Sequence, residues 1–209
     1  VGCTAIEVAN AFKGGMAMDR RITGFFTIGG ISPDTEFTAK TIAADDALMN
    51  IAVTNASCSG LTDDLTSTTS TPGVAPVPQV ETATIVGTVT VAGDADVIVT
   101  AVGMAVGVPQ TVRFAVDVGD NPTAIAAKAR AALALNGTVT AFFNIGAVAG
   151  ADIVLTAKTA AIDDATMNIA SQNAADNGVV PDAFSVHTQA GEAGEYQVET
   201  ATVIATVTV

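Results

Sequence analysis

The stretch Thr38–Ala52, TAKTIAADDALMNIA, returns as Thr156–Ala170, TAKTAAIDDATMNIA, with 12 of 15 residues identical at an offset of 118 residues. A second pair of blocks has the same offset. Val80–Val91, VETATIVGTVTV, and Val198–Val209, VETATVIATVTV, are identical at 9 of 12 positions. Two separated blocks with one common offset indicate an internal repeat rather than low complexity. The sequence therefore predicts tandem modules of about 118 residues.

The offset divides the chain into three parts. Residues 1–79 are expected to be a partial first module that ends in a Ser/Thr/Pro-rich linker, and 80–197 a full second module. Residues 198–209 are expected to be an extra strand that repeats 80–91. The first module is therefore predicted to be incomplete. Alternatively, residues 1–209 are a window of a longer repeat protein, and both ends then continue covalently.

The order of elements in the full module is predicted from its hydrophobic periodicity. Thr123–Leu135 is expected to be an Ala-rich helix, because Asn121 or Asp120 can cap it and Pro122 suits its first turn. Asn136-Gly137 is predicted to end this helix. Alternating or β-branched runs predict strands at 82–91, 96–102, 111–118, 139–145, 152–157, 166–170 and 183–187.

The first module is expected to follow the same order from its helix onward. Its apolar residues share one helical face, which Gly14-Gly15 interrupts: Ala5, Val8, Ala9, Phe12 and Met16. The fold class predicted is α+β, mostly β, with each module a small sheet or sandwich packed by one Ala-rich helix. The 40 Ala and 29 Thr, set against a single Tyr and no Trp, predict a core of small and β-branched side chains.

Charge and hydropathy exclude several classes of partner. The net charge is −13, with 21 acidic and 8 basic residues, and a nucleic-acid surface needs a basic patch instead. Anionic membrane surfaces are disfavoured for the same reason. No run of 18 uninterrupted apolar residues is present, so the sequence predicts no membrane span.

Catalytic signals are weak throughout the chain. His187 is the single histidine, and we interpret it as a surface or edge-strand residue rather than a metal ligand or general base. Nucleophile triads need a histidine held by a carboxylate, and no Gly-x-Ser-x-Gly is present. One Tyr and no Trp also argue against a sugar-stacking platform. We therefore predict no enzyme activity, no catalytic residues and no cofactor.

Acidic pairs recur in both copies, as Asp45-Asp46 and Asp163-Asp164. Paired carboxylates can bind a cation weakly, but the alternating ligands of a calcium loop are absent. The favoured interpretation is a turn in which Asp bonds its own backbone. The acidic residues Asp94, Asp96, Asp117 and Asp120 are interpreted in the same way. Cys3 and Cys58 are expected to be small buried thiols, with a single disulfide as the alternative.

The full copy resembles a family of small modules. GDNPTAIAAKARAALA at 119–134 reads as a turn followed by an Ala-rich helix, and VLTAK and DDATMNIA follow it in that order. This arrangement resembles the small ββαββ repeat domain of tail-sheath and other tail or virion proteins of tailed bacteriophages. The resemblance implies a structural module of a virion or appendage. It implies no catalytic residues.

The C-terminal repeat strand is predicted to join neighbouring chains. We expect it to enter the incomplete first module of another copy by β-strand addition, using six residues: Thr200, Thr202, Val203, Ile204, Val207 and Val209. The function predicted is a non-enzymatic phage structural protein, such as a tail, fibre or decoration component. The expected partners are copies of itself and other virion proteins, and the expected location is the virion. The alternative is a bacterial extracellular filament or cell-surface adhesin.

Overall fold

This computed structural model describes residues 3–53, 67–104, 109–174, 179 and 185–204. The chain forms two compact units: the first combines Val1–Pro76 with Gly194–Val209, and the second is Val77–Ala193. Within the described residues, three small antiparallel sheets and four helices give a mostly-β α+β fold, which confirms the predicted class. Residues 198–209, predicted as an extra strand, group with the first unit.

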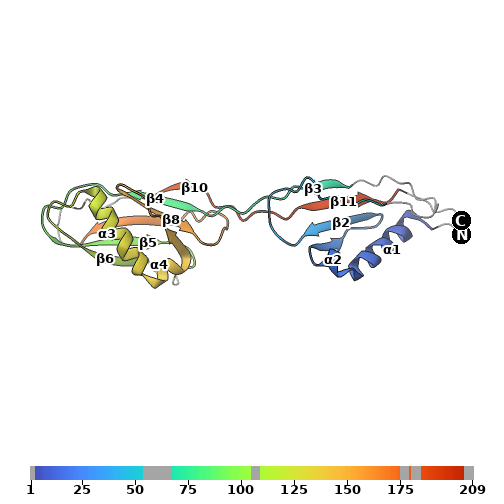
Figure 1. Cartoon of the computed structure of the whole chain (residues 1–209), viewed down its shortest axis with the longest axis horizontal. Coiled ribbons are helices and arrows are strands. Elements are labelled where there is room, and N and C mark those ends of the chain that lie inside the picture. Colours follow the sequence, from blue (N-terminus) through green and yellow to red (C-terminus); the bar gives the residue numbers. More distant parts are fainter. Residues whose placement is uncertain (1–2, 54–66, 105–108, 175–178, 180–184, 205–209) are drawn as a thin grey trace. The chain divides into compact units, whose positions relative to one another are not determined.

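The second unit contains two of the sheets, and its helix α3 contacts strands of both (Figure 1). One sheet has the order β10-β4-β8-β7 and the other β6-β5-β9. Their facing side chains form one continuous apolar core. The elements are β4 (Val80–Thr84), β5 (Gly93–Thr100), β6 (Gln110–Val116), α3 (Pro122–Leu135), α4 (Gly137–Phe142), β7 (Phe143–Ile145), β8 (Asp152–Ala157), β9 (Asn168–Asn173) and β10 (Val186–Gln189).

Helix α3 begins as its sequence predicts. Asn121 Oδ1 accepts a hydrogen bond from Ala124 N at 3.0 Å, and Pro122 occupies the first turn. The predicted face is confirmed, because Ile125, Ala126, Ala129 and Leu133 are fully buried and Ala132 packs against the same core. Small Ala side chains on this face let the helix backbone approach the strands closely.

Helix α3 ends at Leu135, before Asn136-Gly137, as predicted, but the strand predicted at 139–145 is partly wrong. Asn136 is extended rather than left-handed, and its side chain accepts a hydrogen bond from Val139 N at 3.0 Å. Asn136 therefore starts a second helix, α4, and the strand is only Phe143–Ile145. The capping bond outweighs the β preference of the Val and Thr residues in this segment, and Val139 is buried in the core.

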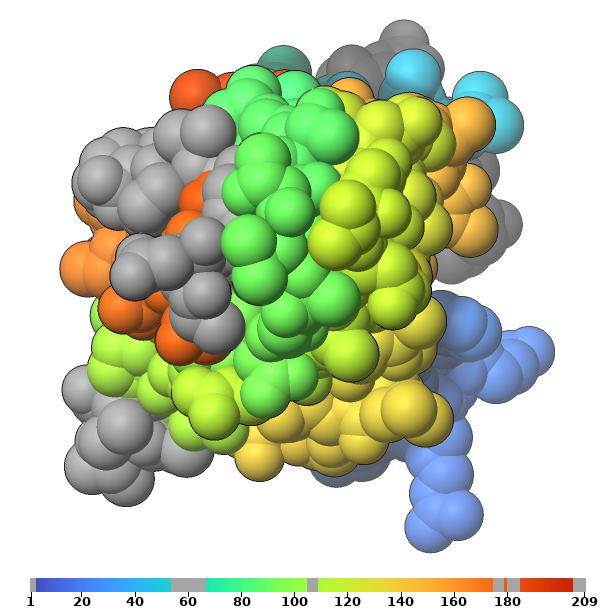
Figure 2. All heavy atoms as spheres, turned by 90° about the vertical axis from the view of Figure 1, so that its left-hand side faces the viewer, coloured from blue at the N-terminus to red at the C-terminus, as the bar shows by residue number. Residues whose placement is uncertain are grey.

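The strand predicted at 82–91 is also shorter than expected. β4 ends at Thr84, although the alternation continues and Ile85 and Val89 are buried. Val89 N donates to Asp120 O, and Gly119 N donates to Val89 O, so the backbone bonds to the segment before α3 instead of to a ladder. The two segments lie side by side in Figure 2, in green and yellow-green. The strand predicted at 152–157 matches β8 at both ends.

The first unit has one sheet, with the strand order β1-β2-β11-β3, and two helices. Helix α1 begins with a capping box, in which Thr4 and Glu7 exchange hydrogen bonds. The elements are α1 (Ala5–Met18), α2 (Arg20–Thr23), β1 (Phe26–Gly29), β2 (Asp34–Ala39), β3 (Thr68–Thr71) and β11 (Val198–Thr202).

Helix α1 runs through Gly14-Gly15, which were predicted to interrupt it. A Cβ at either glycine would meet no atom within 4 Å, so this side of the helix is open and the glycines contribute no packing. The predicted apolar face is confirmed: Ala9 and Met16 are buried, and Ala5, Val8 and Phe12 pack against them. Burial of this apolar face offsets the free-energy cost of two helical glycines, which is about 1 kcal/mol each.

The four-stranded sheets of the two units correspond strand by strand. Strand β2 lies 118 residues before β8, β3 lies 118 residues before β10, and β4 lies 118 residues before β11. The corresponding strands occupy the same positions in the two sheets.

Among the described residues, no helix is both long enough and apolar enough to cross a membrane.

Candidate assembly site

The inserted strand β11 lies inside the sheet of the first unit, between β2 and β3. It pairs with β2 over its whole length, from Val198 opposite Thr38 to Thr202 opposite Asp34. In the second unit, β4 has the same sequence, VETAT, and the same register, from Val80 opposite Thr156 to Thr84 opposite Asp152. Two strands of identical sequence thus occupy two equivalent slots, meaning the central positions of the two four-stranded sheets. Each strand lies far along the chain from both of its partner strands.

The predicted assembly residues fall into three groups. Thr200 and Thr202 donate from β11 to Ser70 Oγ at 3.0 Å and to Asp34 Oδ1 at 2.6 Å. Val203 is buried and its backbone N donates to Pro33 O, whereas Ile204 is exposed. Val207 and Val209 lie outside the described residues. In this structure the strand lies in the sheet of the first unit of its own chain, so the bonds described above are intramolecular.

A buried carboxylate fixes the position of β11. Glu199 is only 1% exposed, and it accepts hydrogen bonds from Ser67 Oγ at 2.7 Å and Thr69 Oγ1 at 2.5 Å. Gln197 Nε2 adds a third donor at 3.3 Å. Burying a carboxylate is costly unless donors meet it. A one-residue slip would turn Glu199 to the opposite face, so these donors specify the register.

A buried amide fixes the start of the same strand. Gln197 is 4% exposed and bonds the backbone of Asp46 twice, accepting from its N at 2.8 Å and donating to its O at 3.0 Å. The side-chain amide of Gln197 thus pairs with the N–H and C=O of Asp46 as the backbone of a neighbouring strand would. It ties the segment before β11 to the Asp45-Asp46 turn.

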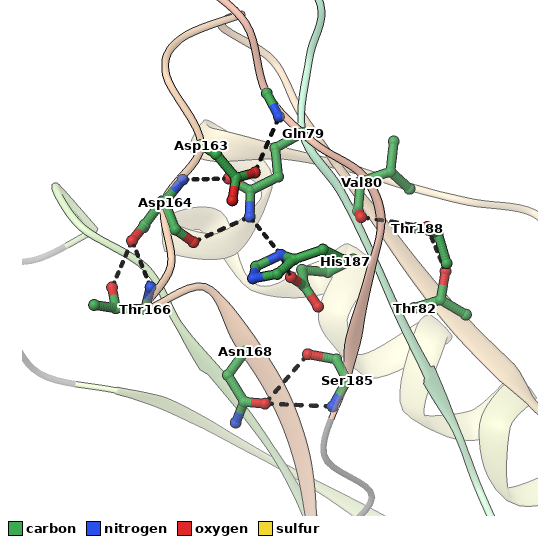
Figure 3. A network of polar contacts seen from close by, with 12 residues as sticks. Gln79, Val80, Thr82, Asp163, Asp164, Thr166, Asn168, Ser185, His187 and Thr188 are labelled. Atoms are coloured by element: carbon green, nitrogen blue, oxygen red, sulfur yellow. Dashed lines mark hydrogen bonds and ion pairs between the residues drawn. The ribbon is translucent and has the colours of Figure 1, made fainter.

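The second unit repeats this amide anchor, which Figure 3 shows from close by. Gln79 accepts from Asp164 N at 2.8 Å and donates to Asp164 O at 3.1 Å. Gln79 Nε2 also lies 2.8 Å from His187 Nδ1. Gln79 and Gln197 are 118 residues apart and both directly precede VETAT, so the anchor belongs to the repeat.

His187 lies on β10, the edge strand of its sheet, as predicted. Its Nδ1 forms an ion-pair contact with the Oε1 of Glu81, the counterpart of Glu199, which is 1% exposed. No hydrogen bond from the described residues reaches either oxygen of Glu81. His187 thus holds Glu81, in the place where Thr69 holds Glu199.

The Asp pairs bond to backbone amides in two ways. Asp46 Oδ1 and Asp164 Oδ1 accept from the backbone N two residues further on, Leu48 N and Thr166 N, each at 2.9 Å, as expected for a turn in which Asp bonds its own backbone. The first Asp of each pair instead bonds a segment 28 residues further along the chain. Asp45 Oδ1 accepts from Gly73 N at 3.2 Å, and Asp163 Oδ1 accepts from Gly191 N at 3.0 Å. Both glycines allow close approach, since a Cβ at Gly73 would lie 2.7 Å from a backbone oxygen. Within the described residues, no group of three or more His, Cys, Asp or Glu side chains could hold a metal ion.

Asp164 is the most heavily used of these carboxylates. It accepts from Thr166 N and Oγ1 at 2.9 and 2.6 Å through one oxygen, and from Val102 N at 2.6 Å through the other. Burial raises the pKa of Asp164, but the bonds from Thr166 and Val102 together outweigh it, and the pKa lies below its ordinary value.

Three of the four other acidic residues named in the sequence analysis are paired with cations. Arg113 donates to both oxygens of Asp96, and Lys128 bonds Asp117 and Asp120. Cys3 is exposed, so the buried thiol predicted there is wrong; Cys58 lies outside the described residues.

Sequence reasoning missed the two glutamines. The signal was present, because the repeated block extends one residue upstream, to QVETAT in both copies. No protein-family model matches this chain, and no curated protein matches it.

Proposed function

We propose that this chain is a non-enzymatic structural protein of a phage particle, such as a tail, fibre or decoration component, built from tandem modules of about 118 residues. Its modules assemble by exchanging the strand VETAT between copies. The observation that carries the proposal is the identical register of β4 and β11 in two equivalent sheets.

Exchange between chains is supported by the route of the polypeptide. The chain leaves the first unit after Pro76 and returns to it at Gly194, and only then supplies β11. A strand delivered from so far along the sequence can come equally from a second copy, because the slot and its donors are unchanged. Such an exchange creates no new contact within the sheet, and its free-energy cost is little more than that of bringing two chains together.

The chemistry of the slot suits a structural role. Hydroxyl, amide and imidazole groups meet the buried carboxylates, and backbone bonds occupy the Asp pairs. These groups hold the inserted strand and the backbone beside it. The proposal therefore includes no catalytic residue, no cofactor and no partner other than copies of this chain and other virion proteins.

The test is a pair of engineered disulfides in a chain carrying Cys3→Ser and Cys58→Ser. Thr200 lies opposite Glu36, so T200C with E36C reports which chain supplies β11. T82C with V154C is the matched control, because these residues are 118 positions away and also lie opposite each other. We expect a ladder of cross-linked multimers from the first pair and monomers from the control. Monomers from both pairs at every concentration refute strand exchange.

The location is tested separately. Gold-labelled antibody against the chain is expected to bind phage particles in micrographs of the native material. Labelling of bacterial surface filaments alone would overturn the virion role and favour the cell-surface alternative.

A further inference from the structure

The two inserted strands bury the same residue but meet it with different chemistry. Glu81 on β4 and Glu199 on β11 are each 1% exposed, and they hold equivalent positions in the two sheets. Glu199 accepts from hydroxyl groups and an amide, whose donor hydrogens do not titrate near neutral pH. Glu81 is met by an imidazole, the side chain that changes charge between about pH 5 and 8. Only the slot of the second unit therefore places a titrating group against its buried carboxylate.

The serine that serves the carboxylate in the first unit does not serve it in the second. Ser67 Oγ donates to Glu199 Oε2 at 2.7 Å, whereas its counterpart Ser185 directs its hydroxyl to Asn168 Oδ1 at 3.2 Å. Neither oxygen of Glu81 receives a hydrogen bond from the described residues. Within this part of the chain, the imidazole is left as the group that meets the carboxylate.

The ring nitrogen that meets Glu81 has a second neighbour. Gln79 Oε1 accepts from Asp164 N, which fixes the other end of the amide, and Gln79 Nε2 lies 2.8 Å from His187 Nδ1. Figure 3 shows this amide directed at the ring. An amide N–H needs a lone pair on Nδ1, whereas an ionised carboxylate needs a hydrogen there. Nδ1 cannot satisfy both at once, so the gain or loss of a proton decides which neighbour it serves.

The charges around His187 favour the protonated pair. Glu81 lies against the ring from β4, and Asp164, in the turn before β9, is close enough to interact with the charge of the ring. Asp163 of the same turn accepts a backbone hydrogen bond instead, and β10 (Val186–Gln189) has no other charged side chain. The imidazole is 37% exposed, so water can deliver or remove the proton although Glu81 is buried.

We propose that Glu81 and His187 form a proton-dependent latch, which ties the edge strand β10 to β4. While the pair holds one proton, the imidazole meets the buried carboxylate. When the proton is lost at higher pH, Nδ1 accepts from Gln79, and Glu81 is left buried without a donor. The latch therefore stabilises the second unit in mild acid, and its contribution falls as pH rises through the range in which imidazoles titrate.

The test compares the two inserted strands within one unmodified chain. Each strand and the residue before it read QVETAT, so their amides have the same intrinsic exchange rates and any difference in protection reports the slots. Amide exchange is measured by NMR, and protection is expressed relative to the intrinsic rate at each pH. From about pH 5.5 to 8, we expect protection of β4 to fall about tenfold and protection of β11 to change less than twofold.

Two variants identify the pair. H187T introduces the residue that serves Glu199 in the first unit, and E81Q replaces the carboxylate by an uncharged amide of the same shape. Both are expected to remove the pH dependence of β4. The matched control combines H187T with V186H, which moves the imidazole to the opposite face of β10 and should not restore the dependence. Circular dichroism checks that each variant is folded.

The ring itself provides a second measurement. His187 is the single histidine, so its imidazole signal in the NMR spectrum is unambiguous. We expect this signal to report loss of the proton over the same pH range in which β4 loses protection.

The proposal is overturned by an equal pH dependence of β4 and β11 in the unmodified chain, by a dependence that persists in folded H187T or E81Q, or by a ring that keeps its proton up to pH 8. The first comparison needs no variant, so it decides the matter even where a variant does not fold. The latch goes beyond the proposed assembly role, and its failure leaves the strand-exchange disulfides unaffected.

Discussion

Replacing Gln197 by alanine tests whether the amide anchor holds β11 in its slot. The substitution removes the two bonds to the Asp46 backbone, at 2.8 and 3.0 Å, and a weaker bond to Glu199 at 3.3 Å. A buried hydrogen bond contributes about 1 kcal/mol net. Asp46 is exposed, so water can replace part of what is lost. The expected loss is therefore about 2 kcal/mol of unfolding free energy for the first unit.

The assay is native-state hydrogen exchange read peptide by peptide, because it reports each unit separately. A loss of about 2 kcal/mol speeds exchange through local opening by roughly 30-fold. We expect this acceleration in β11 and in its partner β2, with β4 and β8 unchanged. Q79A is the reciprocal variant and is expected to accelerate exchange in β4 and β8.

The control is Q189A, since Gln189 is exposed at the end of an edge strand, and its side chain donates, within the described part of the chain, only to the backbone O of Ala190. This change should alter stability by less than about 0.5 kcal/mol. If Q197A changes the exchange of β11 by less than about twofold, the amide does not hold the strand, and the reasoning from its two backbone bonds is wrong.

Three further predictions concern the second unit and the Asp pairs. H187A leaves Glu81 buried without a donor and should cost about 1–3 kcal/mol in urea unfolding, and H187T should recover part of it because Thr69 serves Glu199 in that way. Adding calcium or EDTA should leave the melting temperature unchanged, because backbone amides already occupy the Asp carboxylates; a rise with calcium contradicts this. The lowered pKa of Asp164 stabilises the fold above about pH 4, and this contribution is lost as pH falls through the folded pKa. D164N should therefore make the melting temperature less sensitive to acid over that range.

Local pattern predicted the elements that depend on local chemistry. Helix α3 starts within one residue of its prediction because Asn121 and Pro122 cap it, and β8 matches because its alternation coincides with its ladder. Where the alternation of apolar residues extends beyond the hydrogen-bonded ladder, the prediction of the strand failed. Strand β4 ends at Thr84, although buried residues continue the alternation to Val89. Alternation reports burial on one face and carries no information on which backbone the segment bonds.

Local sequence pattern could not predict the partner strand of β11, for a different reason. Its pairing with β2 joins residues more than 150 positions apart, and the sequence marks only that the strand is a repeat of β4. The repeat indicated that an equivalent slot exists, but both the chain's own first unit and a neighbour's satisfy that condition. Sequence therefore predicted the strand and, as a hypothesis, its entry into the first module of another copy, whereas in this structure it lies in the first unit of its own chain.

The two slots differ in a way that bears on exchange. Each inserted strand carries a buried Glu, yet the donors are Ser67 and Thr69 in one slot and His187 in the other. A strand that entered either slot out of register would bury its Glu away from these donors, at a cost comparable to breaking a buried pair. Both slots therefore accept VETAT in one register only, whichever strand supplies it. We infer that the buried Glu permits exchange of strands while preventing slippage, which is the property a repeating assembly requires.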